Sequence, residues 1–396
     1  MAKIVIENLS KVFGPHPERA LSLLKQGADK DEILKKTGLH VGVNNASFEV
    51  EEGEIVVVMG LSGSGKSTLV RCLNRLIEPT AGKVLIDGED ILALPPEGLR
   101  GMRQKKLGMV FQNFALFPHR TVCQNAEYGL EIQGMAPEER RAKAIESLAL
   151  VGLAGWEDTY PRQLSGGMQQ RVGLARALAL DPDILLMDEA FSALDPLIRR
   201  DMQDELLNLQ SEMRKTILFI SHDLDEALKL GCRIVLMKDG RIVQVGTPEE
   251  ILTEPADDYV ARFVEDVDIT KVLTAEMVMK KSEAVAYLGT DGPRAALRKM
   301  KKAAIGSLFV LNRDNTLAGI VTAEDCVDFK GRDGRDLAEI MTRDIRMVLP
   351  ETPATEIIQI IHDLPHPLPV VTEKGRLKGV VVRGSLLGAI AERGGN

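Results

Sequence analysis

Residues 60–68 read Gly60-Leu61-Ser62-Gly63-Ser64-Gly65-Lys66-Ser67-Thr68. This order fits G-x-x-x-x-G-K-[ST], the pattern of a phosphate-binding loop, which lies between a strand and a helix. The apolar run 54–59 precedes the loop and the helix-like run 68–73 follows it, so this context is present. A chance Gly/Ser-rich turn would not place Lys66 and Ser67 in register behind a strand. The sequence therefore predicts a nucleoside triphosphate site.

The residue types of the loop explain how it would hold phosphate. Its glycines let backbone N–H groups turn toward phosphate oxygens, and the N-terminus of the next helix adds partial positive charge. We expect Lys66 to reach the β- and γ-phosphates and Ser67 to ligate Mg²⁺. The expected contacts of the nucleotide in this loop are Gly60, Ser62, Gly63, Ser64, Gly65, Lys66, Ser67 and Thr68.

Length and composition indicate a globular chain of about two to three domains. Of its 396 residues, 44% are hydrophobic and 27% are charged, which is ordinary for globular domains. No apolar run approaches the roughly 18 residues of a membrane span, and residues 1–7 resemble a first strand rather than a signal peptide, so we expect a cytoplasmic protein. The net charge of −8 argues against bulk nucleic-acid binding. Four widely spaced cysteines indicate neither a disulfide framework nor a zinc site: Cys72, Cys123, Cys232 and Cys326.

Residues 1–265 alternate short apolar runs with amphipathic stretches, a pattern typical of an α/β domain. Between residues 13 and 41 lies an extra stretch that we expect to be a helical insertion, and 137–153 is a further expected helix. We expect residues 266–274 to form a linker. The expected strands include 84–87, 109–111, 184–187, 217–220 and 234–237.

The tail differs from the rest of the chain in charge and contains an internal repeat. Residues 274–396 hold 18 basic and 16 acidic residues, whereas the first 273 residues hold 32 and 42. Positions 60 residues apart match, as Gly319 matches Gly379. Each copy reads as helix, strand, turn, strand and helix, and we expect the two to share a core because one alone is small. Chance likeness between hairpins would not keep one register, so we expect duplicated modules at 275–332 and 333–396.

A second group of small residues also precedes an expected helix, at 168–180. Residues 164–171 read Leu164-Ser165-Gly166-Gly167-Met168-Gln169-Gln170-Arg171. Their backbone N–H groups and the Ser165 hydroxyl would make a second phosphate cradle. Because one domain rarely needs two cradles for one γ-phosphate, we expect a homodimer in which each nucleotide lies between Gly60 of one copy and Ser165 of the other. The expected contacts from this segment are Ser165, Gly166, Gly167 and Gln169.

Two carboxylates, Asp188 and Glu189, end the apolar strand 184–187, at the edge where α/β domains bind ligands. We expect Asp188 to hold Mg²⁺ through water and Glu189 to orient or deprotonate the attacking water. Capping of the following turn is the plainer alternative. It is less favoured because Mg²⁺ beside a phosphate-binding loop needs a carboxylate at this position.

Four further residues are candidates whose types also have common structural roles. Gln112 follows a strand and is a candidate for sensing Mg²⁺ and the attacking water, although a single Gln is usually a surface residue. His222 also follows a strand and is a candidate contact of the γ-phosphate, although a single His is more often structural. The segment 192–195 is placed to carry information across the dimer, and Asp195 equally fits a helix N-cap before proline. Phe13 either stacks on adenine or fills the core.

Together these motifs resemble the ATPase subunit of ABC transporters, over roughly the first two-thirds of the chain. They occur in the order of that family, as the Walker A loop, Gln112, the signature 164–170, the Walker B strand with Glu189, then Asp195 and His222. The resemblance implies ATP and Mg²⁺ as cofactors, with Mg²⁺ near Ser67, Gln112 and Asp188. It also implies a RecA-like α/β core containing the P-loop, with a small antiparallel β subdomain and a helical subdomain.

A narrower resemblance is to importers of glycine betaine, proline and related osmoprotectants. It rests on the insertion 13–43 and on residues 77–80, 114–119 and 187–199. It implies that two ATPase copies power uptake of a quaternary ammonium solute through a separate integral-membrane permease, which is served by a substrate-binding protein or domain. The ATPase would lie peripherally on the cytoplasmic face of the inner membrane, with residues 113–125 toward the permease.

The repeated tail resembles a tandem pair of CBS modules, also of α/β build, which implies regulation. In that family a Thr or Ser followed three residues later by Asp contacts ribose; Thr322 and Asp325 fit, whereas Val382 and Ser385 do not. At most one such nucleotide contact is therefore expected. A second interpretation is that a basic stretch contacts anionic lipid, at about 1 kcal/mol per charge. Because salt screens this contact, the stretch would report cytoplasmic ionic strength. A solvated helix face is the plainer alternative. The basic stretch consists of Arg294, Arg298, Lys299, Lys301 and Lys302.

Three other functions compete with import of glycine betaine. The solute could be choline, carnitine or an amino acid, the chain could be a soluble ABC ATPase acting on DNA or ribosomes, or it could be chiefly a ligand-sensing module. A single cassette, with 98 residues between Lys66 and Ser165, argues against the second function. The complete set of ATPase motifs argues against the third.

Overall fold

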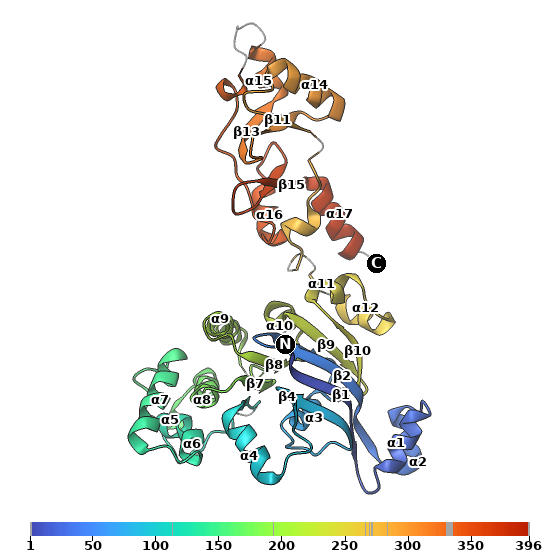
Figure 1. Ribbon diagram of the computed structural model, residues 1–396, viewed down its shortest axis with the longest axis vertical. Coiled ribbons are helices and arrows are strands. Elements are labelled where there is room, and N and C mark those ends of the chain that lie inside the picture. Colours follow the sequence, from blue (N-terminus) through green and yellow to red (C-terminus); the bar gives the residue numbers. More distant parts are fainter. Residues whose placement is uncertain are drawn as a thin grey trace. The chain divides into compact units, whose positions relative to one another are not determined.

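The computed structural model describes residues 2–112, 114–192, 194–265, 267–268, 270, 272–282, 284–329 and 336–394. The chain divides into two compact units, residues 1–264 and residues 265–396 (Figure 1). The expected linker 266–274 and the expected module boundary at 332 include positions that lie outside the described residues.

A mostly parallel sheet of six strands forms the centre of the first unit. Its strands are β3 Ile55–Met59, β6 Leu107–Val110, β7 Ile184–Asp188, β8 Thr216–Ile220, β9 Arg233–Lys238 and β10 Arg241–Gly246. Their order is β10-β9-β3-β8-β7-β6, with β10 as an antiparallel edge. Every residue of β3 is buried, as expected for a parallel strand covered on both faces. The strand before the phosphate-binding loop therefore lies inside the sheet.

Successive residues of β3 belong to two different cores, on opposite faces of the sheet. Ile55, Val57 and Met59 pack in one core, and Val56 and Val58 pack in the other, because neighbouring side chains of a strand point to opposite faces. The helices around the sheet are α3 Lys66–Leu73, α4 Pro96–Lys105, α8 Gly166–Leu178, α9 Pro196–Met213 and α10 Leu224–Leu230. This double covering holds rigid the sheet edge from which the loops of the site leave.

A second, antiparallel sheet is the expected β subdomain. It consists of β1 Ala2–Phe13, β2 His40–Glu51, β4 Ala81–Ile86 and β5 Glu89–Asp90, in the order β2-β1-β4-β5. Its apolar residues share one core with Val56 and Val58 of β3, so the two sheets pack together. The five strands expected from the sequence are all present, with ends shifted by at most three residues.

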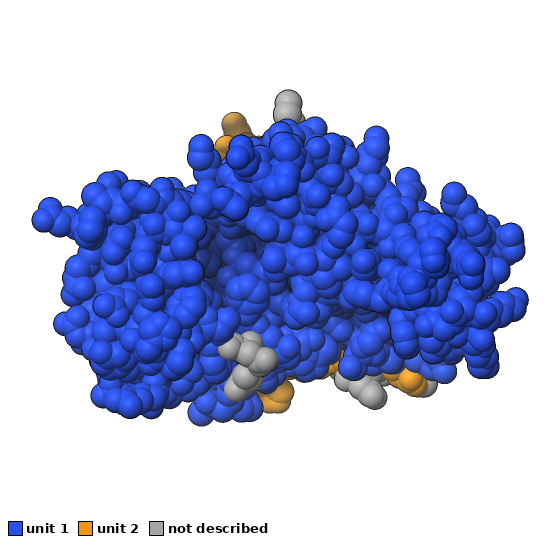
Figure 2. Space-filling model, turned by 90° about the horizontal axis from the view of Figure 1, so that it is seen from below, with its two compact units in different colours: residues 1–264 blue, residues 265–396 orange. Residues whose placement is uncertain are grey.

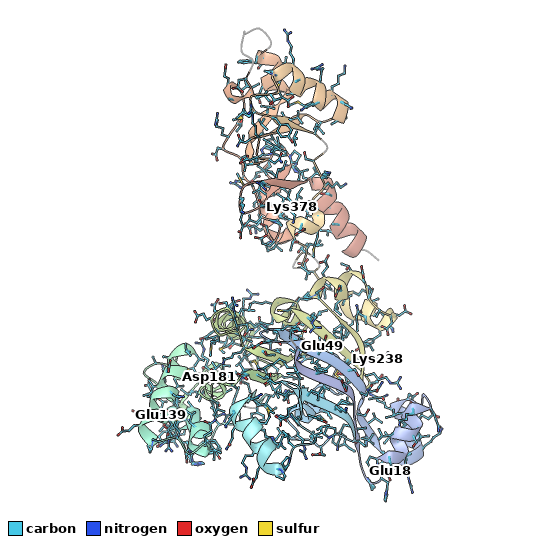
Figure 3. All side chains as sticks on the ribbon, viewed as in Figure 1. Glu18, Glu49, Glu139, Asp181, Lys238 and Lys378 are labelled. Carbon is cyan, nitrogen blue, oxygen red and sulfur yellow. The ribbon has the colours of Figure 1, made fainter. Side chains whose placement is uncertain are left out.

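Helices gather at two ends of the first unit, where Glu139 and Glu18 mark the two groups in Figure 3. One group contains α8 together with α5 Val122–Ala126, α6 Tyr128–Ile132 and α7 Pro137–Leu150. The other is the expected insertion, and it consists of two helices, α1 Glu18–Lys25 and α2 Lys30–Thr37. The side chain of Asp29 caps the start of α2, and Gly38, with a φ of +72°, ends it.

The first unit ends in two short helices, α11 Pro248–Thr253 and α12 Asp258–Val264. Tyr259 and Phe263 of α12 pack against the main core. The Nζ atom of Lys238, labelled in Figure 3, lies 4.4 Å from the centre of the Tyr259 ring. Burial raises the pKa of the Tyr259 phenol, and the neighbouring Leu61 backbone opposes the rise. Helix α12 is therefore packed beside the phosphate-binding loop.

The second unit contains two similar α/β modules. The first has α13 Ala275–Val278, β11 Val285–Tyr287, α14 Pro293–Ala303, β12 Ser307–Leu311, β13 Leu317–Thr322 and α15 Ala323–Asp328. The second has η4 Leu337–Glu339, α16 Ala354–Ile361, β14 Leu368–Val371, β15 Leu377–Val381 and α17 Arg383–Gly394. Helix α14 begins at Pro293, and Pro353, 60 residues later, precedes α16.

The two modules pair through reciprocal backbone hydrogen bonds. The Leu317 N–H donates to the Gly375 carbonyl (2.8 Å), and the Leu377 N–H donates to the Asn315 carbonyl (3.2 Å). The donors and the acceptors each lie 60 residues apart, the spacing of the sequence repeat. A small shared core contains Phe309, Ile320, Ile345 and Val380. The register of the repeat is thus the register in which the modules meet.

A glycine in the antiparallel sheet provides a test of the packing. Gly82 has a φ of +100°, and a Cβ there would lie 2.5 Å from the Cα of Leu9. We predict that Gly82→Ala lowers the free energy of unfolding by about 3 kcal/mol or more, because backbone atoms must move. Gly88, with a φ of +78° and open space around it, is the matched control, and Gly88→Ala should cost about 1 kcal/mol. Urea unfolding followed by circular dichroism compares the two, and equal losses would contradict the prediction.

Candidate nucleotide site

The phosphate-binding loop is pressed between two neighbouring backbone segments. A Cβ at Gly60, which has a φ of +142°, would lie 2.1 Å from the Met237 carbonyl oxygen. A Cβ at Gly65, with a φ of +103°, would lie 2.2 Å from the Gly42 carbonyl oxygen. Only glycine fits at these two positions. Contacts with β9 and β2 therefore keep the loop in its curved shape.

Lys66 begins α3, and its side chain folds back beneath the loop. Its Nζ atom donates to the carbonyl oxygens of Gly60 (2.7 Å) and Leu61 (3.1 Å). The residue is only 5% exposed. Burial lowers the pKa of the ammonium group, and the charges of Glu189 and Asp188 oppose this. An ammonium group held in a dry site interacts strongly with an anionic ligand, because solvent screens it little.

The serines of the loop differ in their surroundings. Ser62 and Gly63 are exposed, and open space surrounds Gly63. Ser64 is buried; its carbonyl accepts from the Gly240 N–H (2.9 Å), and its hydroxyl has no hydrogen-bond partner among the described residues. A buried hydroxyl without a partner calls for a ligand or water. Together with Lys66, these features fit a bound polyphosphate.

Phe13 and Thr68 both lie close to Gly42. A Cβ at Gly42 would lie 2.8 Å from the Phe13 Cε2 atom and 3.0 Å from the Thr68 Cγ2 atom. Phe13 is 39% exposed, and the Nζ atom of Lys11 lies 5.0 Å from the centre of its ring. The alternative that Phe13 fills the core is therefore wrong. Its stacking on adenine stays a prediction, with the ring beside the loop.

Asp188 ends β7 and is nearly fully buried, at 1% exposure. Its carboxylate accepts from the Ser67 hydroxyl (2.9 Å) and from Nη2 of Arg71 (3.1 Å). Both partners come from α3, the helix that follows the phosphate-binding loop. A hydroxyl and a carboxylate side by side suit Mg²⁺, which usually takes one or two protein ligands together with phosphate oxygens.

Glu189 meets the two other predicted catalytic residues. Its Oε2 atom accepts from Nε2 of Gln112 (2.9 Å) and lies 3.4 Å from Nδ1 of His222. Its φ is +47°, in the left-handed region, which costs a non-glycine residue about 1–3 kcal/mol. Such strain persists where surrounding contacts hold it, often at functional sites. The carboxyl edge of the parallel sheet thus brings Gln112, Glu189 and His222 together.

The second predicted cradle lies at the start of α8. Ser165 and Gly166 are exposed, and the Ser165 hydroxyl accepts a backbone N–H of the first helical turn (3.3 Å). The Gln169 amide donates to the carbonyls of Pro161 (3.1 Å) and Leu164 (3.2 Å), so it braces this loop. In the described part of the chain, no hydrogen bond or ion pair joins this segment to the phosphate-binding loop. Figure 2 shows that the surface of the first unit is hollowed beside the group of helices α5 to α8, which lies on the left of the view.

The start of α9 contacts this second cradle. A Cβ at Gly167 would lie 2.4 Å from Cγ2 of Ile198, so only glycine allows this approach. The Asp195 side chain accepts from the Ile198 N–H (3.1 Å) and caps α9, as the structural alternative predicted. A role of 192–195 across a dimer stays a prediction, and Ala193 lies outside the described residues.

Sequence reasoning missed two arginines that the structure brings to the site. Besides Arg71, Arg176 of α8 donates to the carbonyl oxygens of Phe114 (2.9 Å) and Ala115 (2.5 Å). These two residues have φ values of +52° and +51°, so Arg176 braces a strained turn just after the predicted glutamine. Burial lowers the pKa of the Arg176 guanidinium. Helical spacing after Ser67 could have indicated Arg71, whereas no sequence pattern indicated Arg176. Between the glutamine and this turn, Asn113 lies outside the described residues.

Comparison with known proteins assigns the family. Residues 43–192 match the ABC transporter family, and residues 275–331 and 337–392 each match the CBS domain. The chain is 58% identical to the glycine betaine transport ATP-binding protein OpuAA of Bacillus subtilis, over 98% of this chain and 92% of that protein. The chain belongs to the ATP-binding proteins of ABC transporters. This ABC protein is therefore an ATPase whose activity is coupled to transport.

A second relative and a solved structure agree with this assignment. The ABC protein is 57% identical to the glycine betaine/carnitine transport ATP-binding protein GbuA of Listeria monocytogenes, over 99% of this chain and 98% of that one. It matches a dimeric post-hydrolysis structure of the ATP-binding cassette MJ0796 with ADP and Pi at 33% identity and a TM-score of 0.53, over 62% of this chain and 98% of that chain. The expected fold is thus confirmed as an ABC ATPase cassette followed by a CBS pair. Within the described ranges, no helix combines the length and the apolar character of a membrane span.

The buried ammonium group of Lys66 gives the first test of the site. We predict that Lys66→Met, which keeps an unbranched side chain but removes the ammonium group, weakens ATP binding about 10- to 100-fold through loss of charge-assisted hydrogen bonds. Lys83→Met, at an exposed position of β4, is the matched control and should bind ATP normally. Equilibrium titration with a fluorescent ATP analogue measures both, and unchanged affinity of the Lys66 variant would exclude its role.

Proposed function

We propose that this ABC ATPase powers the import of glycine betaine, proline-type and related compatible solutes. The observation that carries the proposal is the near full-length identity, of 58% and 57%, to two proteins named for glycine betaine transport. Relatives named for choline and carnitine transport are 39% and 37% identical, and one named for trimethylamine N-oxide matches over 71% of this chain. Glycine betaine stands in both of the first two names, and carnitine stands beside it in the second. The values therefore favour glycine betaine over choline and over trimethylamine N-oxide, whose named relative is 52% identical.

The proposed roles at the site follow from its contacts. The loop N–H groups and Lys66 would bind the β- and γ-phosphates. Ser67, which donates to Asp188, would ligate Mg²⁺, Asp188 would hold it through water, and Gln112, which donates to Glu189, would sense it. When bound, Mg²⁺ neutralises charge on the phosphate oxygens. Glu189 orients or deprotonates the attacking water.

The remaining catalytic role is that of the histidine. His222, 3.4 Å from the Glu189 carboxylate, faces the same γ-phosphate and contacts its oxygens. Its side chain is 54% exposed, so the imidazole can reach a ligand without moving core residues. The carboxylate and the imidazole therefore act on one reacting centre.

We propose that two copies enclose each nucleotide. Ser165 and Gly166 are exposed at the start of a helix, where N–H groups favour an anion. Within the described residues they make no hydrogen bond to the phosphate-binding loop of their own copy. The binding site of the γ-phosphate, which begins with Lys66 of one copy, is therefore completed by Ser165 of the other copy. ATP then favours the closed dimer, and hydrolysis lets it open.

The segment after Gln112 is proposed to dock on the membrane permease. Asn125, fully buried, donates from Nδ2 to the carbonyls of Phe117, Arg120 and Thr121 and accepts at Oδ1 from the Phe117 N–H. This carboxamide makes 117–121 a rigid turn. A rigid turn next to Gln112 can transmit closure of the dimer to a partner. The permease in turn receives solute from a substrate-binding protein or domain, and the ATPase lies peripherally on the cytoplasmic face of the inner membrane.

The CBS pair is proposed to regulate transport, through a nucleotide or through anionic lipid. The Thr322 hydroxyl donates to Asp325 (2.6 Å) and caps α15. The two residues expected to contact a ribose are therefore hydrogen-bonded to each other. On α14, Lys299 is not part of the exposed basic face, because its Nζ atom binds Asp291 (2.7 Å) and the Val285 carbonyl (3.0 Å). The exposed basic residues that could contact an anionic ligand are Arg294, Arg298, Lys301 and Lys302.

The catalytic role of Glu189 has a direct test. We predict that Glu189→Gln binds ATP but hydrolyses it at least about 100-fold more slowly, because the amide cannot act as a base. An ATP-bound dimer should then accumulate. Glu212→Gln, an exposed residue on α9, is the matched control and should hydrolyse ATP normally. Phosphate release and size-exclusion chromatography measure the two effects. Near-normal turnover by the Glu189 variant would remove it from this role.

The proposed solute has a separate test in the complete transporter. We predict that ATP hydrolysis in lipid vesicles rises when glycine betaine is added, and only above a threshold of internal salt, if the CBS pair regulates transport. Hydrolysis is measured with and without glycine betaine, at low and at high internal salt. Strong hydrolysis that ignores glycine betaine would leave the ATPase correct and the solute wrong, and proline, choline and carnitine would be tested next.

A further inference from the structure

Arg199, near the start of α9, links two segments that carry the proposed catalytic groups. Its Nη2 atom donates to the carbonyl oxygens of Ser192 (3.3 Å) and Leu194 (3.2 Å). Its Nη1 atom donates to Oδ2 of Asp223 (3.2 Å). Ser192 and Leu194 closely follow Glu189 in the chain, and Asp223 directly follows the histidine of the site. One guanidinium group therefore holds both segments.

These contacts close a ring that begins and ends at Glu189. The N–H and the hydroxyl of Ser192 both donate to the Glu189 carbonyl, at 3.1 and 2.9 Å. Ser192 is joined through Arg199 to Asp223, the neighbour of His222. The imidazole of His222 returns to Glu189, with 3.4 Å between Nδ1 and Oε2. Apart from the contact between His222 and Glu189 itself, Arg199 is the side chain of this ring that joins its two backbone segments.

The two catalytic groups in the ring need such support. Glu189 has a left-handed φ of +47°, a conformation that surrounding contacts must hold. The side chain of His222 is 54% exposed, so core packing does not fix it. A misplacement of about 1 Å at a reacting centre can cost about 100-fold in rate. The separation between this carboxylate and this imidazole is therefore a quantity on which catalysis depends.

A second side chain of α9 anchors the segment that carries the histidine. Nε2 of Gln203 donates to Oε1 of Glu226 (3.0 Å), and the Ser221 hydroxyl donates to Oε2 of the same carboxyl group (2.5 Å). Burial raises the pKa of that carboxyl. Gln203 is four residues after Arg199, so the two project from one face of the helix. Helix α9 thus holds residues 221–226 at two points.

We propose that Arg199 is a positioning residue that sets the separation between the Glu189 carboxylate and the His222 imidazole during ATP hydrolysis. The ion pair with Asp223 is not the main effect, because the two side chains are 26% and 36% exposed, and such pairs contribute little. The planar guanidinium reaches two carbonyls and a carboxylate at once. A lysine ammonium group is a point donor and does not reproduce this fork.

The test measures steady-state ATP hydrolysis of the complete transporter in lipid vesicles. We expect Arg199→Lys and Arg199→Ala to lower kcat about 10- to 100-fold, with KM for ATP changed less than about threefold. The thermal midpoint of Arg199→Lys should equal that of the parent. Arg200→Ala, at the exposed neighbouring position of α9, is the matched control and should keep the parent kcat.

Two results would overturn the inference. One is a near-normal kcat in Arg199→Lys, which would show that a positive charge is sufficient. The other is a loss of activity that only follows the loss of folded protein, with kcat per folded molecule unchanged. Asp223→Ala removes the carboxylate that accepts from Nη1 of Arg199 and needs no change at Arg199. It should lower kcat similarly, without adding to the effect of Arg199→Lys, and additive losses would contradict the ring.

The inference rests on the proposed roles of Glu189 and His222, so Glu189→Gln is measured in parallel. If Glu189→Gln hydrolyses ATP at a near-normal rate, the proposed catalytic role fails and the inference fails with it. If Glu189→Gln is inactive while Arg199→Lys is normal, the catalytic role stands and only the inference about Arg199 fails.

Discussion

The close approach of the phosphate-binding loop to two neighbouring strands is the constraint on which the site depends. Carbonyl oxygens of β9 and β2 fill the space that side chains at Gly60 and Gly65 would need. The loop is thereby fixed to the buried sheet, and the ammonium group of Lys66 is enclosed beneath it. Because α3 starts at this lysine, Ser67 meets Asp188 at the end of another strand. One packing constraint thus fixes the geometry of the residues proposed to bind phosphate and metal.

In the proposed dimer, a single copy would supply only half of each nucleotide site. The first cradle has its lysine, hydroxyls and carboxylates in place, whereas Ser165 begins α8 at the surface. Helix α8 also carries Arg176, which braces the strained turn after Gln112. A ligand bound between two copies would therefore act on the helix that supports the proposed permease contact. This arrangement gives a physical route from nucleotide binding to movement of a membrane partner, as a shift between open and closed states.

The sequence predicted the parts of the site that are contiguous in the chain. Residues 60–68 follow the strand β3 and start α3, and residues 184–189 are the strand β7 with the residue after it. Because parallel strands end at one edge of a sheet, the glutamine and histidine that follow other strands meet there as well. Arg71, Arg176 and Arg199 were not assigned these roles, because the contacts of a long side chain depend on how distant helices pack. The duplication in the tail was predictable because a repeat keeps its register, whereas the pairing between the two modules required the structure.

The central claim is that each nucleotide lies between two copies of this chain. Cryo-electron microscopy of the complete transporter with Glu189→Gln, ATP and Mg²⁺ tests it most directly. The account predicts two ATP molecules, each with its γ-phosphate within hydrogen-bond distance of Lys66 of one copy and Ser165 of the other. ATP contacted by one copy alone, with Ser165 facing solvent in the ATP-bound state, would contradict it.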